Sequence, residues 1–489
     1  MVESRTAKVL ILSSGKALTA LVGLVSVVIL TRILSQLDFG AYRQAMLAYT
    51  FAAPFAILGL DRALYAFLPG EKERPRGLLV ENLLLLTIAG SILSLFIIFG
   101  GDELLAKRFN NPALATLLSL MVLYPLFMLP STALSACLMS CNRTGQLAVF
   151  NVASNLFMFL LIVIPCLFLP KPSTAVLGQV AGAVLTTTVA VYLMFRSCPG
   201  PTWRPTLNGM KKQLSFAVPL GLSSIIGTVS VTLPQLIVSF RCTTEIFAVY
   251  TVGAMEIPLI GIITGSITSV VLVDYARFYR EGDLQAIVDL IHKAMIRSAI
   301  LILPVATLLF SVASELMRIL FGNSYEWGSV PFRIYLLQLP IRTITFGAIL
   351  QATGNSKNIL VYSLLYFGAI AVFGWTLVSM FGAAGAAISS VLAEYFVGVP
   401  YLIIVMSKIL NTKVIDLFPW SDMGKILIIS GLPSVIVVAL KSIMMLSDIS
   451  WIIVALVIFI PVVIIGFKIA KIITPTELIN IVRGVTMKS

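Results

Sequence analysis

Apolar runs of about 20 residues follow one another along almost the whole chain, with short polar segments between them. A helix of about 20 residues crosses the roughly 30 Å hydrocarbon core of a bilayer. The pattern therefore predicts an all-α polytopic membrane protein with about fourteen membrane-spanning helices. We place these spans near residues 8–34, 41–68, 77–99, 113–140, 145–169, 174–195, 214–240, 247–274, 285–311, 328–352, 358–380, 383–407, 424–446 and 449–470.

A weak internal repeat divides the chain. Phe39-Gly-Ala-Tyr42 is echoed 208 residues later by Phe247-Ala-Val-Tyr250, and other segments match in the same order at offsets between 207 and 212 residues. Six spans in each copy place both halves in the membrane in the same direction, as a parallel repeat around a central cavity. The repeat predicts an N-terminal six-helix lobe (1–195), a cytoplasmic linker (196–213), a C-terminal six-helix lobe (214–410) and two extra helices with a cytoplasmic tail (411–489).

The charge distribution predicts the orientation in the membrane. The chain has 34 Lys and Arg against 21 Asp and Glu, a net charge of +13 and a mean hydropathy of +1.02. Most of the basic residues fall on alternate loops, on the side that carries both termini. By the positive-inside rule both termini are cytoplasmic. The basic excess is therefore mainly a topology signal, and we expect no nucleic-acid partner.

Several kinds of chemistry have no signature in the sequence. There is one histidine, no Cys/His cluster and no phosphate-binding loop of the Walker type. The five cysteines (Cys137, Cys141, Cys166, Cys198 and Cys242) show no metal spacing and are interpreted as small apolar fillers. A membrane glycosyltransferase or polymerase would carry a sizeable extracytoplasmic loop, whereas the outward loops here are short. We expect a transporter rather than an enzyme, without metal or cofactor.

Charges inside the spans are candidates for a transport pathway, because an ionisable group at the bilayer centre is unfavourable by about 3 kcal/mol on insertion scales. Lys16 and the pair Asp61–Arg62 lie at similar depths, roughly 12 Å from the inner ends of their spans at 1.5 Å per residue. Two interpretations stay open: a structural ion pair of Lys16 with Asp61, or a substrate site. In the first, Arg62 needs another partner.

The second half contributes Arg297 and Arg342, the strongest candidates for an anion site. Glu256 and Glu394 are intramembrane acids that either neutralise these arginines or bind a proton or sodium ion. Asp61 is the third acid inside the spans and is likewise a candidate for ion coupling. A cavity with more basic than acidic groups suits an anionic ligand, and guanidinium groups match phosphate geometry. A lipid linked through pyrophosphate meets that requirement.

Three further arginines, Arg32, Arg43 and Arg241, lie near the outer membrane surface. Long side chains snorkel there at low free-energy cost, so snorkelling is the default interpretation and a cavity mouth is the alternative. Prolines inside several spans predict bent helices, and Pro54 and Pro258 occupy nearly equivalent repeat positions. These bends are either ordinary kinks or hinges for transport.

Three segments resemble a known family: TRILSQLDFGAYRQAMLA from Thr31, GLDRALYAFLPG from Gly59, and LFGNSYEWGSVPFRIYLLQLPIRTITFGAILQATGNSK from Leu320. They are similar to the polysaccharide transporter family, the Wzx-type O-antigen flippases, within the multidrug/oligosaccharidyl-lipid/polysaccharide (MOP) flippase superfamily. The resemblance covers nearly all of residues 1–410. The family pattern has glycine-proline where this chain has Ser35-Gln36, so the turn at that point differs.

The resemblance implies two six-helix lobes, alternating access, and export of an undecaprenyl-pyrophosphate-linked oligosaccharide across the bacterial inner membrane. It implies a cation-lined cavity, and the two extra helices are similar to those that help form a lipid-tail groove in fourteen-span members. Expected partners are the lipid-linked substrate, membrane lipids, a polysaccharide polymerase and a chain-length regulator, with the protein a monomer. Coupling to an H⁺ or Na⁺ gradient is left open.

Other functions stay as alternatives. A drug/cation antiporter of the multidrug and toxin extrusion (MATE) type belongs to the same superfamily, but an acid-rich cavity would favour it. A lipid II-type flippase shares the pyrophosphate-linked class of substrate. A lipid-binding scaffold that transports nothing has only the lack of an obvious ion site in its favour.

The predicted topology is testable by cysteine labelling in intact cells. A membrane-impermeant reagent should modify single cysteines placed near Asn110, Ser173 and Asn323, because these loops are predicted to face outward. Cysteines near Lys72, Thr206 and Lys357 should react only after the cells are opened. Labelling of the second group in intact cells would contradict the arrangement of fourteen spans.

Overall fold

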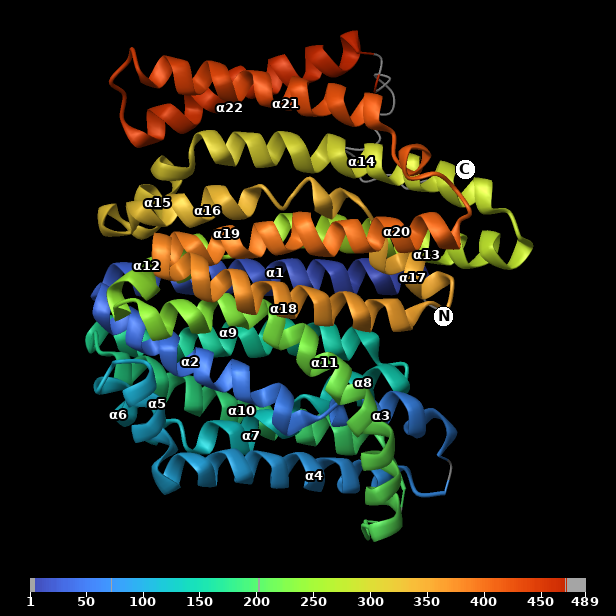
Figure 1. Cartoon of the computed structure of the whole chain (residues 1–489). Coiled ribbons are helices and arrows are strands. Elements are labelled where there is room, and N and C mark those ends of the chain that lie inside the picture. Colours follow the sequence, from blue (N-terminus) through green and yellow to red (C-terminus); the bar gives the residue numbers. More distant parts are fainter. Residues whose placement is uncertain (1–4, 72, 201–202, 471, 473–489) are drawn as a thin grey trace. The chain divides into compact units, whose positions relative to one another are not determined.

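The computed structural model describes residues 5–71, 73–200, 203–470 and 472, without the side chains of residues 5–14, 16, 223 and 356. All regular secondary structure in this part of the chain is helical (Figure 1). By their internal contacts the residues form two compact units, Met1–Val252 with Ser363–Ser389, and Gly253–Tyr362 with Ser390–Ser489. The lobes predicted from the repeat stay a prediction.

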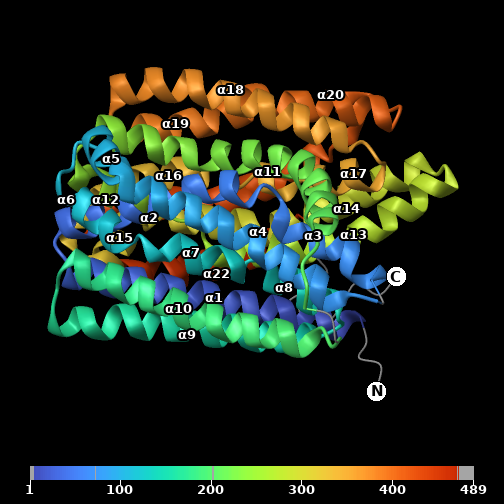
Figure 2. The ribbon, with the colours of Figure 1, turned by 90° about the horizontal axis from the view of Figure 1, so that it is seen from below.

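The first unit holds the helices of the N-terminal half. They are α1 (Arg5–Ile33), α2 (Gln36–Ile57), α3 (Leu60–Phe67), α4 (Pro75–Phe96), α5 (Asp102–Arg108), α6 (Ala113–Leu120), α7 (Leu123–Ser131), α8 (Ala133–Ser140), α9 (Thr144–Phe168), α10 (Pro172–Ser197), α11 (Leu207–Arg241) and α12 (Thr244–Gly253). Within it α1 packs along α9, α9 along α10, and α4 along α7 (Figure 2). Leucines and alanines of α3, α4 and α8 form a buried core with the end of α10 and the start of α11.

The second unit holds most of the remaining helices. They are α13 (Pro258–Glu281), α14 (Leu284–Ser311), α15 (Ala313–Phe321), α16 (Ser329–Leu336), α17 (Phe346–Ala352), α20 (Val399–Ile409), α21 (Trp420–Lys441) and α22 (Asp448–Ile469), while α18 (Ser356–Phe381) and α19 (Ala383–Ala393) contribute to both units. One core joins α13, α14, α17 and α20. The pair α21–α22 packs on α14 through two smaller clusters (Figure 1).

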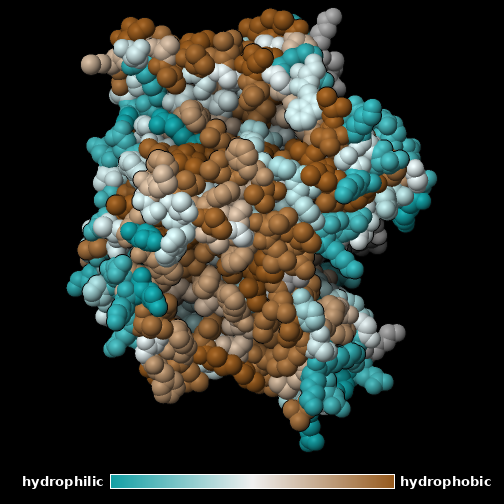
Figure 3. Space-filling view, in the orientation of Figure 1, coloured by the Kyte–Doolittle hydropathy of each residue, from teal (hydrophilic) through white to brown (hydrophobic). Residues whose placement is uncertain are grey.

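The helices have the length and apolar character of membrane spans. Among the described residues, eleven helices qualify singly, and two bent pairs raise the number to thirteen. The predicted first span corresponds to α1, of which only Ala17–Ile33 enters this test, as a shorter apolar helix. On the face in Figure 3, apolar residues gather along the middle of the helices and hydrophilic residues toward their ends. The prediction of an all-α polytopic membrane fold is confirmed.

The predicted bends are breaks in the helices. Span 2 consists of α2 and α3, which meet at an angle of 41°. Pro54 lies in the last turn of α2, and the break follows at Leu58 and Gly59, both with positive φ. In span 8 the break separates α12 from α13, and Pro258 is the first residue of α13. Each proline therefore stands next to a break, and a role of these breaks as hinges stays a prediction.

The break in span 2 is covered by α11 at a close approach of two glycines. A Cβ atom on Gly59 would lie 2.7 Å from the carbonyl oxygen of Ala217. A Cβ atom on Gly221 would overlap the backbone carbonyl group of Leu58. Only glycine permits this separation, so the local sequence lets α11 shield backbone that has left the helix.

A network of charged side chains fastens the C-terminal helix pair to α15. The Arg318 guanidinium donates to both carboxylate oxygens of Asp448, at 2.6 to 3.1 Å, and also pairs with Glu326 and Glu315. The Lys441 ammonium at the end of α21 lies 2.8 Å from Glu315. The hydrogen bond to Asp448, together with the other carboxylates, raises the pKa of Arg318. Both helices of the pair are therefore tied to α15 through their polar ends.

The close approach predicts that Gly221→Ala destabilises the protein. The added methyl group must displace the backbone at Leu58, and overpacking of this kind typically costs about 1–3 kcal/mol. Gly227→Ala is the matched control, because it lies in the same helix and a Cβ there meets nothing within 4 Å. Thermal unfolding of the purified variants should show a lower midpoint for Gly221→Ala alone. Equal midpoints would contradict the packing described at the break.

Candidate substrate site

Arg342 lies where span 10 leaves the α-helical path. The span consists of a segment from Asn323 to Leu336 and a segment from Ile341 to Ala352, bent by 50°. Pro340 has no N–H to continue a helical ladder, and a short 3₁₀ turn, η4 (Ile341–Thr343), follows it. Ile344 is extended, and α17 begins only at Phe346. Arg342 therefore projects from an irregular segment inside a membrane-length element.

Glu256 lies in the break between α12 and α13, and its carboxylate forms an ion pair with Arg342. The break in span 8 thus supplies the carboxylate of this ion pair, and the break in span 10 supplies the guanidinium group. The side chains keep 43% (Arg342) and 64% (Glu256) of their surface exposed. Each side chain therefore keeps surface that neither its partner nor the rest of the protein covers.

Glu394 is the second carboxylate near Arg342, with which it interacts electrostatically. It begins a π-helical segment, η5 (Glu394–Gly398), between α19 and α20. The Tyr362 hydroxyl lies 3.0 and 3.1 Å from the two carboxylate oxygens. Gly398 leaves room for that ring, because a Cβ atom there would lie 2.8 Å from Tyr362 Cε2. Single π-turns of this kind occur often at functional sites.

A cavity of about 360 Å³ adjoins these groups within the second unit. Its polar lining includes the side chains of Arg342, Glu394 and Tyr362, two hydroxyl groups of α13 and an amide group of α17. All the residues that line the cavity are Thr264, Thr268, Ile341, Arg342, Ile344, Thr345, Phe346, Gly347, Ala348, Leu350, Gln351, Ile359, Tyr362, Glu394 and Leu402. Tyr275 of α13 is hydrogen bonded to Thr345 at 3.0 Å and holds the irregular segment in place. The volume and the few convergent polar groups are typical of a small-ligand site.

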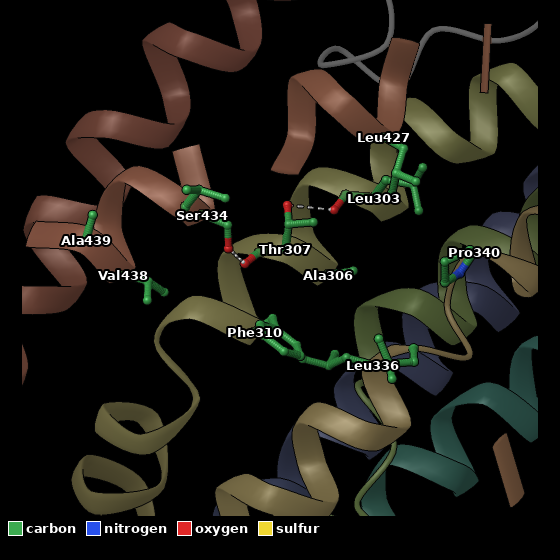
Figure 4. A pocket seen from close by; sticks show the side chains of 12 residues that line it. Leu303, Ala306, Thr307, Phe310, Leu336, Pro340, Leu427, Ser434, Val438 and Ala439 are labelled. Atoms are coloured by element: carbon green, nitrogen blue, oxygen red, sulfur yellow. Dashed lines mark hydrogen bonds between the residues drawn. The ribbon is translucent and has the colours of Figure 1, made fainter. Parts of the chain in front are cut away.

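A second cavity in the same unit, of about 530 Å³, is almost wholly apolar (Figure 4). It is lined by α14, α16 and α21, with Leu303, Ala306, Thr307, Phe310, Leu336, Leu337, Pro340, Leu427, Ser434, Val435, Val438 and Ala439. Its two hydroxyls are occupied by backbone carbonyls: Thr307 donates to Ser430, and Ser434 donates to Thr307, each at 2.7 Å. The cavity therefore offers hydrocarbon surface to a ligand.

Among the described residues, neither Arg297 nor Arg62 belongs to the lining of the cavity that holds Arg342. Arg297 is exposed on α14 and does not line the cavity described above. Arg62 is exposed in the first turn of α3, in the other unit, and neighbours the half-buried Asp61. The side chain of Lys16 lies outside the described part of the chain, so a Lys16–Asp61 pair stays a prediction. Their role in binding is likewise untested.

The three outer arginines differ from one another. Arg32 is exposed at the end of α1, and Arg43 is half-buried in α2. Arg43 Nε is buried and makes no hydrogen bond within the described residues. The Arg241 guanidinium lies 4.1 Å from the ring centroid of Trp375, a cation–π contact. A cavity-mouth role for these residues stays a prediction.

Sequence reasoning missed Tyr362 and a buried polar cluster in the first unit. Tyr362 faces Glu394 only because α18 passes η5, and no sequence spacing signals that. Glu81, 1% exposed, accepts hydrogen bonds from Thr206 N and Oγ1 at 2.8 and 2.7 Å and pairs with Arg74. A signal existed here, since a carboxylate inside an apolar run needs a partner. The cluster ties α4 to the segment before α11.

Comparison with known proteins gives one family and one fold. A family model described as "Polysaccharide biosynthesis protein" matches residues 6–275, more than half of the chain. No curated protein sequence matches significantly.

Several solved structures that are similar to this chain are described as flippases or transporters. "Lipid II flippase MurJ, inward closed conformation" has a TM-score of 0.77 and 16% identity, covering 94% of this chain and 98% of that chain. An inward-facing MATE multidrug resistance transporter of the MOP superfamily has a TM-score of 0.62 and 14% identity, covering 81% and 96%. A MOP transporter from Pyrococcus furiosus, described as having a binding pocket of reverse polarity, has a TM-score of 0.59 and 14% identity, covering 83% and 97%.

The three solved structures differ in the fraction of this chain that they match. Residues 1–410 cannot supply 94% of this chain, so the match to the MurJ structure includes part of the region that holds α21 and α22. Coverage of 81% to 83% leaves room to exclude that region. The match to the MurJ structure thus extends into the region of the helix pair, at an identity that shows fold alone.

Proposed function

Since the chain belongs to the polysaccharide biosynthesis protein family, we propose that it is a flippase for an undecaprenyl-pyrophosphate-linked oligosaccharide, such as an O-antigen or other surface polysaccharide repeat unit. It would act by alternating access in the bacterial inner membrane, with both termini cytoplasmic. The observation that carries the substrate class is Arg342, an exposed arginine on an irregular segment at the edge of a cavity.

The ion pair suggests how a pyrophosphate would be received. Arg342 forms a charge-assisted bond with Glu256, and the pair is exposed. Phosphate oxygens match the guanidinium fork at least as well as a carboxylate does. Binding would therefore exchange one anionic partner for another and leave no unpaired arginine, while Glu256 becomes free to take up a proton.

The apolar cavity beside α21 supports the lipid part of the substrate. Its lining side chains offer no free hydrogen-bonding group from Thr307 or Ser434, so a polyprenyl chain would bury apolar surface there. It shares Pro340 and the preceding leucines with the irregular segment that carries Arg342. One bent span would thus contact both the lipid and the charged head group.

Two alternatives differ in the ligand. A MATE-type antiporter would present carboxylates to a cation, whereas here Glu256 is already paired with Arg342. A lipid II-type flippase carries the same pyrophosphate link, and the structural similarity of the C-terminal helix pair favours it as the second candidate. Competition between lipid II and an oligosaccharide-linked lipid in reconstituted vesicles separates the two. Partners would be membrane lipids, a polymerase and a chain-length regulator, and the protein would act as a monomer.

Arg342→Ala should abolish export while the protein stays folded. The Arg342 side chain is 43% exposed, so its truncation leaves no buried cavity and the unfolding midpoint should hardly change. Arg342→Lys should restore part of the export, because it keeps the charge and loses the planar fork. Arg277→Ala is the control, an exposed arginine paired with Asp274. Surface polysaccharide and membrane protein level are measured together, and normal export by Arg342→Ala removes the residue from the mechanism.

Filling the apolar cavity should slow the flipping of long-chain substrates. Val435→Trp places a larger side chain in the cavity wall formed by α21. Val457→Trp on α22 is the matched control. The two valines are 67% and 66% exposed, but only Val435 lines the cavity. Reconstituted flipping is compared for a full-length polyprenyl substrate and a short-tailed analogue. Flipping should be slow only for Val435→Trp with the full-length polyprenyl substrate. An equal loss with the short analogue would remove the cavity from lipid binding.

Ion coupling would require a carboxylate whose charge changes between the inward and outward states. We assign this role to Glu256, protonated when it faces outward and paired with Arg342 when it faces inward. Flipping in vesicles should then respond to an imposed proton or sodium gradient, and Glu256→Gln should remove the response. Glu394→Gln is the comparison, because that carboxylate is held by Tyr362. Flipping rates that do not change with either gradient, or full gradient dependence in Glu256→Gln, would exclude Glu256 as the coupling carboxylate.

A further inference from the structure

Three of the five cysteines meet at one point in the first unit. Cys137 lies in α8, Cys141 follows the last residue of that helix, and Cys198 follows the last residue of α10. Cys137 and Cys141 share a helix face, since residues four apart are neighbours on a helix. Packing of α10 on α8 brings the third thiol to that face.

The thiols have the spacing of ligands around one metal ion. The Cys137 and Cys198 sulfurs are 3.5 Å apart, those of Cys141 and Cys198 are 4.0 Å apart, and all three lie within 4.8 Å of one another. Two thiolates bound to one ion at about 2.3 Å lie about 3.8 Å apart in tetrahedral and about 4 Å apart in trigonal geometry. The observed separations require little movement to reach either value.

Burial favours binding at this point. Cys137 and Cys198 are 0% and 1% exposed, whereas Cys141 is half-buried and gives an ion access from the surface. Cys141 is therefore the first ligand that an entering ion meets, and the two buried thiols complete the set.

We propose that Cys137, Cys141 and Cys198 form a three-thiolate site for a soft metal ion, with Cu⁺ as the ion that the ligand set fits. Thiolates select soft ions such as Cu⁺ and Zn²⁺. No histidine or carboxylate joins the cluster among the residues that the structure describes. Three sulfur ligands complete a trigonal Cu⁺ site, whereas Zn²⁺ needs a fourth ligand, which would be water. The bound ion fastens the end of α8 to the end of α10.

Metal titration of the purified, reduced full-length protein tests the site. Cu⁺ is added anaerobically against a chromogenic competitor, Zn²⁺ is added in a parallel experiment, and bound metal is counted by elemental analysis. We expect one Cu⁺ per chain, held more tightly than Zn²⁺, and protection of three thiols from alkylation. The metal-bound protein should also unfold at a higher temperature, since a ligand specific for the folded state stabilises it.

Two serine variants provide the matched comparison. Cys141→Ser should lose the bound ion and the rise in unfolding temperature, whereas Cys242→Ser should keep both. Cys242 is the proper control because it is also half-buried and also follows the last residue of a helix, α11. Metal-free unfolding midpoints check that both variants fold. Absence of stoichiometric metal, tighter binding of Zn²⁺, or equal binding by the two variants would overturn the proposal.

Discussion

Every backbone polar group that leaves a helix inside the hydrocarbon region must find its partner within the protein, because lipid supplies none. The break at Leu58–Gly59 shows how this chain meets that constraint. Gly221 lets α11 approach the exposed backbone, and the Asn82 amide donates to the Leu60 carbonyl oxygen at 2.9 Å. At this break, neighbouring helices thus cover the backbone that has left the helix and supply a hydrogen-bond donor to it.

Two helix breaks also supply the charged residues of the candidate site. Glu256 and Arg342 both leave from breaks, in spans 8 and 10, and meet as an exposed ion pair. Of the two, Arg342 also lines the cavity, together with Glu394. A pyrophosphate bound at Arg342 would replace the Glu256 carboxylate as the anionic partner of the guanidinium. Glu394, held by Tyr362, is the more firmly fixed of the two carboxylates.

The helix pair α21–α22 is held in place by ion pairs at its ends and by apolar packing along its middle. Arg318 and Lys441 anchor it at Asp448 and Glu315, while buried side chains of α14 pack against its middle. This anchoring leaves an apolar cavity open beside α21. The thiol cluster in the other unit joins the ends of two helices in a comparable way, through sulfur instead of charge. Contacts between helix ends, formed by a few polar or polarisable atoms, thus recur in both units.

The sequence alone determined the spans, since the apolar run length is set by bilayer thickness, and it placed Arg342, Glu256 and Glu394 inside them. The prolines also marked two breaks to within a turn. Pairing of Glu256 with Arg342, the contact of Tyr362 with Glu394 and the meeting of Cys198 with the α8 thiols were decided by tertiary structure. Each joins residues from different helices, and local periodicity specifies which face of a helix is apolar but not which helix will pack against it.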